Sequence, residues 1–303
     1  MLPYPLNINY LKHCAMKKLL MVMAAAAMLL SCEKNEPEAV ADVKESEPWV
    51  HTTWTFNVGP GVSHEAMART RADLSALNLT DLWVMDYVGS ELMQTVHQSS
   101  TDDGFGSVTL DLGYGEHTIC FCASRGTGPS LSGSVVSWEK PSDTFWHSLA
   151  LTVAAGIPVT AQQVTLSRVA TRLRVSPTDK IPEGAAKLTC SPSVWYYGLD
   201  LLTGEAAGER VQQREIAIPA TYVGTAGELS ASFFGLSSAE PWQTDVTVAV
   251  LDGDGSVMGS VTLEGVTMSR NVTTVYSGGI FGKGGTMSIT ADDGWGADDI
   301  HEW

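Results

Sequence analysis

The sequence predicts an all-β protein with two tandem β-sandwich domains. Short runs of residues alternate apolar and polar side chains, and they are rich in Val, Thr, Leu and aromatic residues. Gly, Asp and Ser separate these runs, a pattern typical of strands joined by turns. Helical periodicity is rare, and Ser63–Leu77 is the one weak candidate for a helix or turn. No fixed-period repeat is visible, but the two halves of the chain have similar size and style.

Residues 49–165 form the predicted N-terminal sandwich. Alternating apolar residues mark its strands, for example at Val108, Leu110 and Leu112. The Gly/Ser-rich segment Arg125–Pro141 predicts a long loop between two of them. The candidate strands, in chain order, are Val50–Val58, Leu77–Val88, Glu91–Gln98, Val108–Leu112, His117–Ala123 and Ser142–Ala155.

The alternation changes phase near Arg168. Val164 and Leu166 lie in one phase, whereas Val169 begins a run in the other phase. A slip of one residue turns the apolar side chains of a strand to the opposite face of the sheet. We therefore expect a bulge or a crossing between two sheets at this point. The predicted domain boundary lies here, so the C-terminal sandwich comprises residues 166–303.

The C-terminal half repeats the style of the first. The segment Asp252–Gly255, with the sequence Asp-Gly-Asp-Gly, predicts a hairpin turn between two strands. A Gly-rich loop, Phe281–Gly285, precedes the last candidate strand. The candidate strands are Lys187–Cys190, Val194–Leu199, Glu215–Ile218, Leu229–Leu236, Asp245–Leu251, Ser256–Leu263, Thr273–Ile280 and Thr286–Thr290.

The N-terminus carries the pattern of a secretory signal. Lys17 and Lys18 precede the apolar run Leu19–Leu30, which is too short to span a bilayer. Ser31-Cys32 at its end resembles a lipobox, which implies cleavage before Cys32 and acylation of its thiol. Residues 1–31 are therefore read as a signal peptide. Because Met16 directly precedes the lysines, residues 1–15 are interpreted as an upstream extension from a misplaced start codon.

Residues 32–48 form a predicted acidic tether behind the lipidated cysteine. Glu33–Glu47 contains six acidic residues, two Lys and one Pro, with few apolar residues. Such a composition predicts a disordered segment. An acidic stretch just after an acylated Cys also resembles the surface-export signal of Bacteroidetes lipoproteins. The expected location is the cell outer membrane, as a surface-exposed lipoprotein attached through its N-terminal lipid.

The charge of the chain argues against nucleic acid as a partner. The chain has 18 Lys and Arg against 34 Asp and Glu, a net charge of −16. A chain of this charge repels phosphate backbones. Its hydrophobic content of 44% provides enough apolar side chains for a core.

No catalytic constellation is visible, so the chain is not expected to be an enzyme or to hold a cofactor or metal. It has no G-x-S-x-G, H-E-x-x-H or P-loop pattern. Asp252–Gly255 is better explained as a turn than as a calcium loop, because Val257 stands where an EF-hand needs Gly. Cys120 or Cys122 could pair with Cys190, although buried free thiols are the favoured alternative.

The nine Trp residues suggest a glycan-binding alternative, since flat aromatic faces stack on sugars. Trp54, Trp83 and Trp195 lie inside β-type runs, where core packing is expected. Trp138 and Trp242 lie near loops and are the candidate glycan contacts. Trp146 and Trp295 are further surface candidates.

The order of these features resembles the Bacteroidales fimbrial subunits, most closely the FimB-like anchor family. The likeness spans nearly the whole mature chain. It is carried by the lipobox with its acidic tether and by Leu110–Ala123, a Gly-Tyr element followed by an apolar strand. Val164–Val175, with Arg168 and Arg172, and Arg270–Phe281 complete the pattern.

The resemblance implies two transthyretin-like (Greek-key) sandwiches and assembly with fimbrillin subunits by strand complementation. In this family the polymerising pilins lose an N-terminal strand by cleavage after an Arg, whereas anchor subunits keep it and stay acylated at the outer membrane. Arg69 and Arg71 lie where a pilin would be cut. The implied function is a structural one, the lipid anchor of a fimbria. The alternatives are a polymerising or tip subunit, or a surface lipoprotein that binds a glycan or host-surface ligand.

Overall fold

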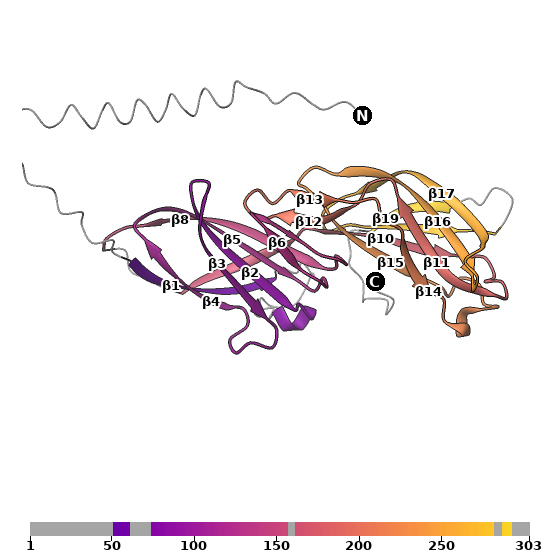
Figure 1. The fold of residues 1–303 in the computed structure, drawn as a ribbon, viewed down its shortest axis with the longest axis horizontal. Coiled ribbons are helices and arrows are strands. Elements are labelled where there is room, and N and C mark those ends of the chain that lie inside the picture. Colours follow the sequence, from indigo (N-terminus) through magenta and orange to yellow (C-terminus); the bar gives the residue numbers. More distant parts are fainter. Residues whose placement is uncertain (1–50, 61–73, 157–160, 282–286, 293–303) are drawn as a thin grey trace, which may run out of the picture. The chain divides into compact units, whose positions relative to one another are not determined.

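The computed structural model describes residues 51–60, 74–156, 161–281 and 287–292 (Figure 1). Contacts separate Met1–Pro48 from one compact unit, Trp49–Trp303. The signal peptide, Cys32, the tether, Arg69 and Arg71 lie outside the described residues. Across the described ranges, no helix has the length and apolar character needed to cross a bilayer. Two short 3₁₀ helices, η1 (Leu74–Leu77) and η2 (Ala220–Tyr222), accompany the strands.

The first sandwich is one seven-stranded sheet of order β3-β2-β5-β8-β9-β1-β4, whose parts β3-β2-β5-β8 and β9-β1-β4 form two layers around a shared core. At one corner β8 and β9 join the two layers through only two residue pairs, Phe145–Arg168 and Trp146–Ser167. The strands are β1 (His51–Pro60), β2 (Asp81–Val88), β3 (Glu91–Ser99), β4 (Ser107–Gly113), β5 (Gly115–Ser124), β8 (Thr144–Val153) and β9 (Gln162–Arg168).

Alternation along these strands builds the first core. Val108, Leu110 and Leu112 of β4 are buried, and the residues between them are exposed. Phe56 of β1 meets Phe121 of β5 across the core, with ring centroids 5.5 Å apart. The alternation read from the sequence therefore identifies the faces that pack together.

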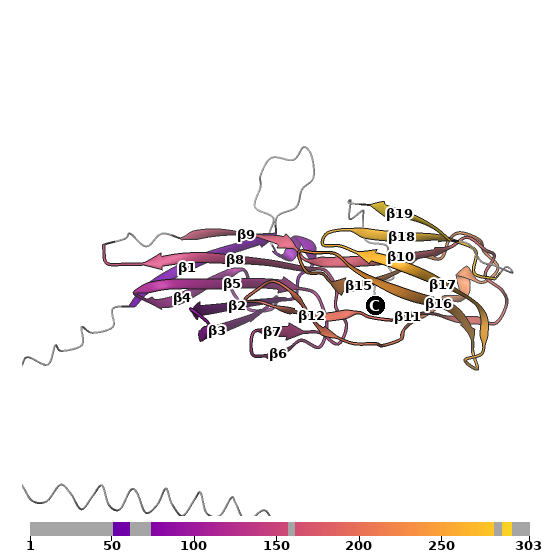
Figure 2. The same ribbon diagram turned by 90° about the horizontal axis from the view of Figure 1, so that it is seen from above.

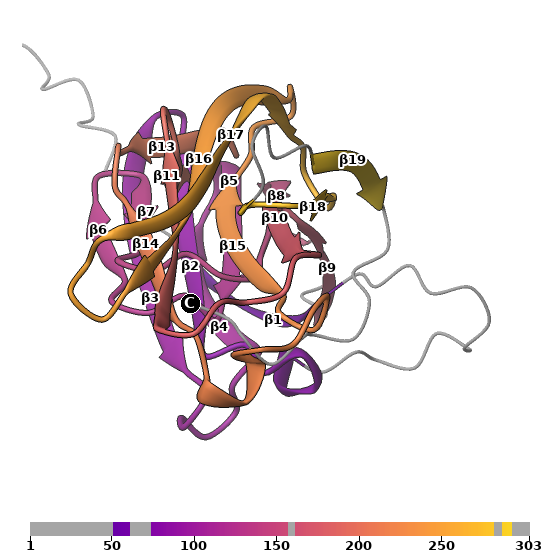
Figure 3. The ribbon, with the colours of Figure 1, turned by 90° about the vertical axis from the view of Figure 1, so that its right-hand side faces the viewer.

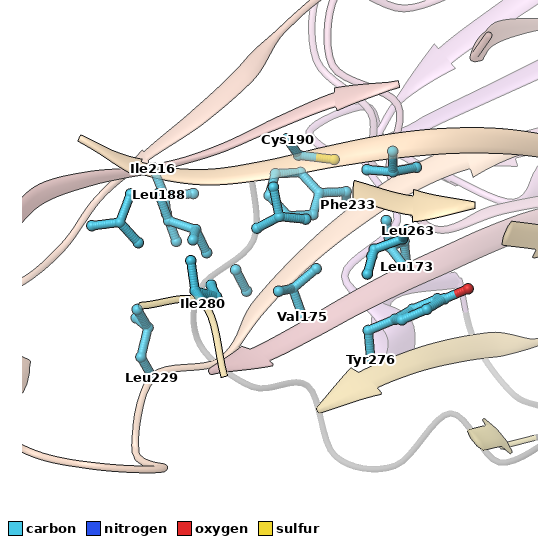
Figure 4. Close-up of a cluster of buried hydrophobic side chains, with 14 of the residues drawn as sticks. Leu173, Val175, Leu188, Cys190, Ile216, Leu229, Phe233, Leu263, Tyr276 and Ile280 are labelled. Atoms are coloured by element: carbon cyan, nitrogen blue, oxygen red, sulfur yellow. The ribbon is translucent and has the colours of Figure 1, made fainter. Parts of the chain in front are cut away.

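The second sandwich packs the sheet β15-β10-β18-β19 against the sheet β14-β11-β16-β17. Figure 3 shows these two layers edge-on, and Figure 4 shows apolar side chains from both layers meeting between them. The strands are β10 (Ala170–Pro177), β11 (Ala185–Pro192), β14 (Arg214–Ala217), β15 (Ala231–Leu236), β16 (Trp242–Asp252), β17 (Val257–Met268), β18 (Thr273–Gly278) and β19 (Met287–Asp292).

The two sandwiches share one topology. In each, the first strand pairs antiparallel with the fourth core strand and parallel with the seventh, as β1 does with β4 and β9, and β10 with β15 and β18. The other sheet follows the same order in both, β3-β2-β5-β8 and β14-β11-β16-β17. The all-β fold of two sandwiches is confirmed, and the chain repeats one architecture without repeating a sequence.

A fourth sheet, β13-β12-β7-β6, is built from one insertion in each sandwich. The strands β6 (Ser130–Ser132) and β7 (Val135–Ser137) lie between β5 and β8, and β12 (Tyr196–Asp200) and β13 (Ala206–Glu209) lie between β11 and β14. Pairing of β7 with β12 joins the two insertions. The segment 125–141, predicted to be a loop, therefore contains two strands, which were missed because each is only three residues long.

This fourth sheet covers the outer face of β2 and β5. Met85, Cys120 and Cys122 point away from the first core and pack against Val136 and other buried side chains of the insertions. Both faces of β2 and β5 are thus buried. The three cysteines of the described region, Cys120, Cys122 and Cys190, are free and buried, which agrees with the favoured alternative of buried thiols.

The phase break near Arg168 coincides with a crossing between sheets. β9 ends at Arg168 in the first sandwich, and β10 begins at Ala170 in the second. The predicted hairpin is also present, because Asp252–Gly255 joins β16 to β17. Its Asp252 carboxylate accepts hydrogen bonds from the backbone nitrogens of Asp254 (3.0 Å) and Ser256 (2.8 Å), as expected for a turn. No metal-binding cluster of His, Cys, Asp or Glu is found among the described residues.

Candidate assembly site at the first strand

Strand β1 lies between β9 and β4 at one end of the seven-stranded sheet. It pairs antiparallel with β4 from His51↔Gly113 to Asn57↔Ser107, and parallel with β9 from Phe56↔Gln162 to Pro60↔Leu166. Both edges of the strand are therefore engaged in main-chain pairing. Without β1, the facing edges of β4 and β9 would lose this partner.

Buried and half-buried side chains alternate along β1, as expected for a strand with one face in the core. Trp54, Phe56 and Val58 lie in the first core and are at most 8% exposed. Burial of each such side chain contributes about 1.5–3 kcal/mol. The intervening Thr55 and Asn57 are only half-buried. The position of β1, which we call its slot, thus holds an extended segment with large apolar side chains at every second residue.

Two further contacts hold β1 near its C-terminal end. The backbone nitrogen of Val58 donates to the carbonyl oxygen of Gly106 at 2.7 Å, outside the regular ladder. Leu74 of η1 is fully buried in the first core, next to β1. Arg69 and Arg71 belong to the connection between β1 and η1, in residues 61–73, outside the described ranges.

The second sandwich shows that the fold accommodates an additional strand. Its β10 lies between β15 and β18, as β1 lies between β4 and β9. A later segment, β19, then pairs antiparallel with the outer edge of β18, from Thr273↔Asp292 to Gly278↔Met287 (Figure 2). Strand addition at a sheet edge thus occurs within this chain.

The two candidate glycan contacts are less accessible than the sequence indicates. Trp138, expected on the surface, is fully buried because the β6–β7 insertion folds onto β2 and β5. Its ring offers no free face to a sugar. Trp242 is half-buried; its indole nitrogen donates to the carbonyl oxygen of Leu236 (3.1 Å), and the rings of Trp195 and Tyr196 pack against it with centroids 5.5 and 5.2 Å away. Glycan contact by Trp242 stays a prediction.

Arg168 links the two sandwiches at the crossing. Its Nε and Nη2 donate to the two carboxylate oxygens of Asp143 at 2.6 and 2.9 Å. Its Nη1 donates to Oδ1 of Asn271 at 3.1 Å, in the turn before β18. The guanidinium also lies 4.7 Å from the ring centroid of Phe145. The sequence marks Arg168 through the phase break, but its partners, 25 and 103 residues away, leave no local signal.

Comparison with known proteins finds similar solved structures only. No family model matches the chain, and no curated protein does. The fimbrial anchor protein Mfa2 from Porphyromonas gingivalis is similar at 10% identity and a TM-score of 0.48, covering 84% of this chain and all of that one (100%). A fimbrial assembly protein from Parabacteroides distasonis has 10% identity and a TM-score of 0.45, covering 80% and 99%. The tip fimbrial protein Mfa3 from P. gingivalis, truncated at its C-terminus, has 12% identity and a TM-score of 0.39, covering 70% and 93%.

Proposed function

We propose that this chain is a structural subunit of a fimbria, and that it serves as the lipid anchor that ends the fimbria at the outer membrane. The observation that carries the proposal is the slot of β1. This strand is held by main-chain pairing on both edges and fills the first core with Trp54, Phe56 and Val58. Its place at the start of the compact unit lets a single cut after it release the whole strand.

Strand complementation follows from the chemistry of such a slot. Main-chain hydrogen bonds to β4 and β9 supply affinity for any extended segment, whatever its sequence. The pockets of Trp54, Phe56 and Val58 supply specificity, because a donor must carry apolar side chains at the same alternate positions. A neighbouring fimbrillin subunit with such a segment replaces β1 only after β1 has left.

The position of Cys32 distinguishes an anchor from a polymerising subunit. Cys32 and β1 both precede Arg69 and Arg71, so one cleavage at these arginines removes the lipid and opens the slot together. An uncleaved chain keeps its lipid and its own β1, and it cannot accept a donor strand there. Because it accepts no strand from a neighbour at β1, such a subunit stands at the end of a fimbria in which the other subunits do accept one. Its acyl chains contribute about 0.8 kcal/mol per buried CH₂, and two or more chains give stable attachment.

The test of the anchor role is the N-terminus of the mature protein. Mass spectrometry of the native protein is expected to show an acylated Cys32. Cys32→Ser is expected to release the protein from the membrane fraction, whereas Asn35→Ser, a control substitution three residues further along the tether, is expected to leave it there. A mature N-terminus at Thr70 or Ala72 without lipid contradicts the anchor role and favours a polymerising subunit.

The slot itself is tested with a chain that lacks β1. A chain that begins at Ala72 is expected to bind a synthetic peptide of residues 49–60, measured by fluorescence anisotropy. The matched peptide with Phe56→Asp is expected not to bind, because it places a carboxylate in the apolar core. Equal binding of both peptides would refute recognition through the side-chain pockets.

A further inference from the structure

A polar hollow of about 570 Å³ lies in the second half of the compact unit, formed by β12, β14 and the connection between β13 and β14. Tyr197 and Arg214 line it and are buried, with exposed fractions of 1% and 8%. The other lining side chains are exposed and polar. They are Glu139, Lys140, Arg210, Gln212, Gln213 and Glu215.

Arg214 is buried with one of its two terminal nitrogens unused. Its Nη1 donates to the carbonyl oxygen of Phe234 at 3.0 Å, an oxygen that also accepts from the indole nitrogen of Trp195 at 2.8 Å. Its Nη2 has no hydrogen-bond acceptor in the described part of the chain, and neither does the hydroxyl group of Tyr197 have a partner there. Leaving such groups unpaired in the interior is unfavourable. Arg214 and Tyr197 interact electrostatically with each other, but neither of these two atoms has a partner at hydrogen-bonding geometry in the described part of the chain, so both can still bind a ligand.

Two arginines flank the ring of Tyr197. The guanidinium carbons of Arg210 and Arg214 lie 5.3 and 5.5 Å from the centroid of the same Tyr197 ring. No carboxylate within the described ranges forms an ion pair with either arginine, and Glu215 pairs with Lys187 at 3.0 Å. Burial lowers the pKa of Arg214, and its interactions with Tyr197 and Cys190 oppose this effect only in part. A buried arginine without an ion-pair partner in the described ranges is unexpected in a chain of net charge −16.

We propose that this hollow binds the carboxylate group of an acidic sugar, a hexuronic or sialic acid. A planar carboxylate matches the geometry of a guanidinium group, and here two guanidiniums and the Tyr197 hydroxyl can donate to it. Gln212 and the amide nitrogen of Gln213, whose amide oxygen accepts from Ser191 at 3.3 Å, can donate to hydroxyl groups of the ring. The volume is within the range of small-ligand sites, about 300–1,000 Å³.

The rim favours a singly charged ligand. Glu139 lines the hollow and would repel a phosphate dianion more strongly than a carboxylate. Because Nη2 of Arg214 and the Tyr197 hydroxyl are buried, the ligand reaches them when exposed rim side chains turn aside. Arg210, Gln212 and Gln213 stand on the exposed connection before β14, whose side chains are free to do so. The site lies apart from β1 and does not depend on fimbrial assembly.

Isothermal titration calorimetry of the mature chain tests the ligand class. Galacturonate and N-acetylneuraminate are the two probes, and binding of either supports the proposal. The methyl ester of galacturonate, which keeps the shape and loses the charge, is expected to bind at least about tenfold more weakly. Binding of inorganic phosphate alone, equal binding of the ester, or no binding of either acid would overturn it.

Variants assign the binding to these residues. Arg210→Gln removes an exposed side chain, so the fold should survive, and affinity is expected to fall about tenfold or more. Arg214→Lys keeps the charge but loses the planar fork, and a similar loss is expected. Lys180→Gln, an exposed cation elsewhere, is the control and should change affinity less than twofold. If Arg214→Lys does not fold, the affinity of Arg210→Gln alone tests whether these residues bind the ligand. An unchanged affinity in Arg210→Gln, or an equal loss in Lys180→Gln, would overturn the assignment.

Discussion

Replacing Arg168 with Ala is expected to destabilise the compact unit strongly. The side chains of Arg168 and Asp143 are only 11% and 6% exposed, and two hydrogen bonds of 2.6 and 2.9 Å join them. Removal of the guanidinium leaves the Asp143 carboxylate buried and unpaired. Breaking a buried pair in this way costs about 3–5 kcal/mol. The hydrogen bond to Asn271 and the contact with the Phe145 ring are lost as well.

Urea denaturation of residues 49–303, monitored by tryptophan fluorescence, measures this cost. The double variant Arg168→Met with Asp143→Leu is the matched control, because it removes both charges and keeps apolar volume at the junction. We expect it to recover most of the lost stability. A loss of less than about 1 kcal/mol in Arg168→Ala would refute the reasoning, since that is the range of a solvent-exposed ion pair.

Two further predictions concern packing and pH. Gly126→Ala places a Cβ atom 2.5 Å from Cδ1 of the fully buried Trp138, so a loss of about 1–3 kcal/mol is expected in the same denaturation assay. Gly253→Ala, whose Cβ meets nothing within 4 Å, should change stability by less than about 0.5 kcal/mol, and equal losses would contradict the packing argument. Burial raises the pKa of Cys120 from 9.0 to about 11 and that of Cys190 to about 12. Above pH 9 the unfolded chain loses thiol protons that the folded chain keeps, so stability should fall as pH rises, by up to about 1.4 kcal/mol per thiol and pH unit. Replacing both cysteines with Ala should flatten the decline between pH 9 and 10, and an unchanged slope would contradict this cause.

The strands that pair over long ladders are those that the sequence predicts best. Val108, Leu110 and Leu112 alternate cleanly because β4 has one face in the core and one in solvent. β5 is harder to interpret, since the fourth sheet covers its outer face and makes a continuous run of buried residues. The phase break at Arg168 is visible because β9 and β10 bury opposite sets of residues within one continuous segment of chain.

Local sequence patterns predict neither the junction between the sandwiches nor the polar hollow. β6, β7 and β13 have three or four residues each and contain Ser, Gly and Ala. They are therefore too short and too weakly apolar to show the alternation that marks a strand. Trp138 lies in the Gly/Ser-rich segment that the sequence predicts to be a loop, so a surface position is expected, although packing of the β6–β7 hairpin against β2 and β5 buries it. One feature of the sequence does mark Arg214, because it lies two residues before Ile216 and so on the same buried side of β14. A charged residue in an apolar phase marks a position worth testing, but its relation to Tyr197 needs the fold.

The repeated topology bears on the proposed strand exchange, because β1 and β10 differ in how the chain connects them. β10 and β1 hold equivalent places in their sheets, each between an antiparallel and a parallel neighbour. β10, however, is joined to β9 on one side and to β11 on the other, so its release would require two cuts and would separate the sandwiches. β1 is the first strand of the compact unit, and one cut after it suffices. The strand exchange proposed above would therefore spare the junction, where the pairing of β7 with β12 and the contacts of Arg168 hold the two sandwiches together.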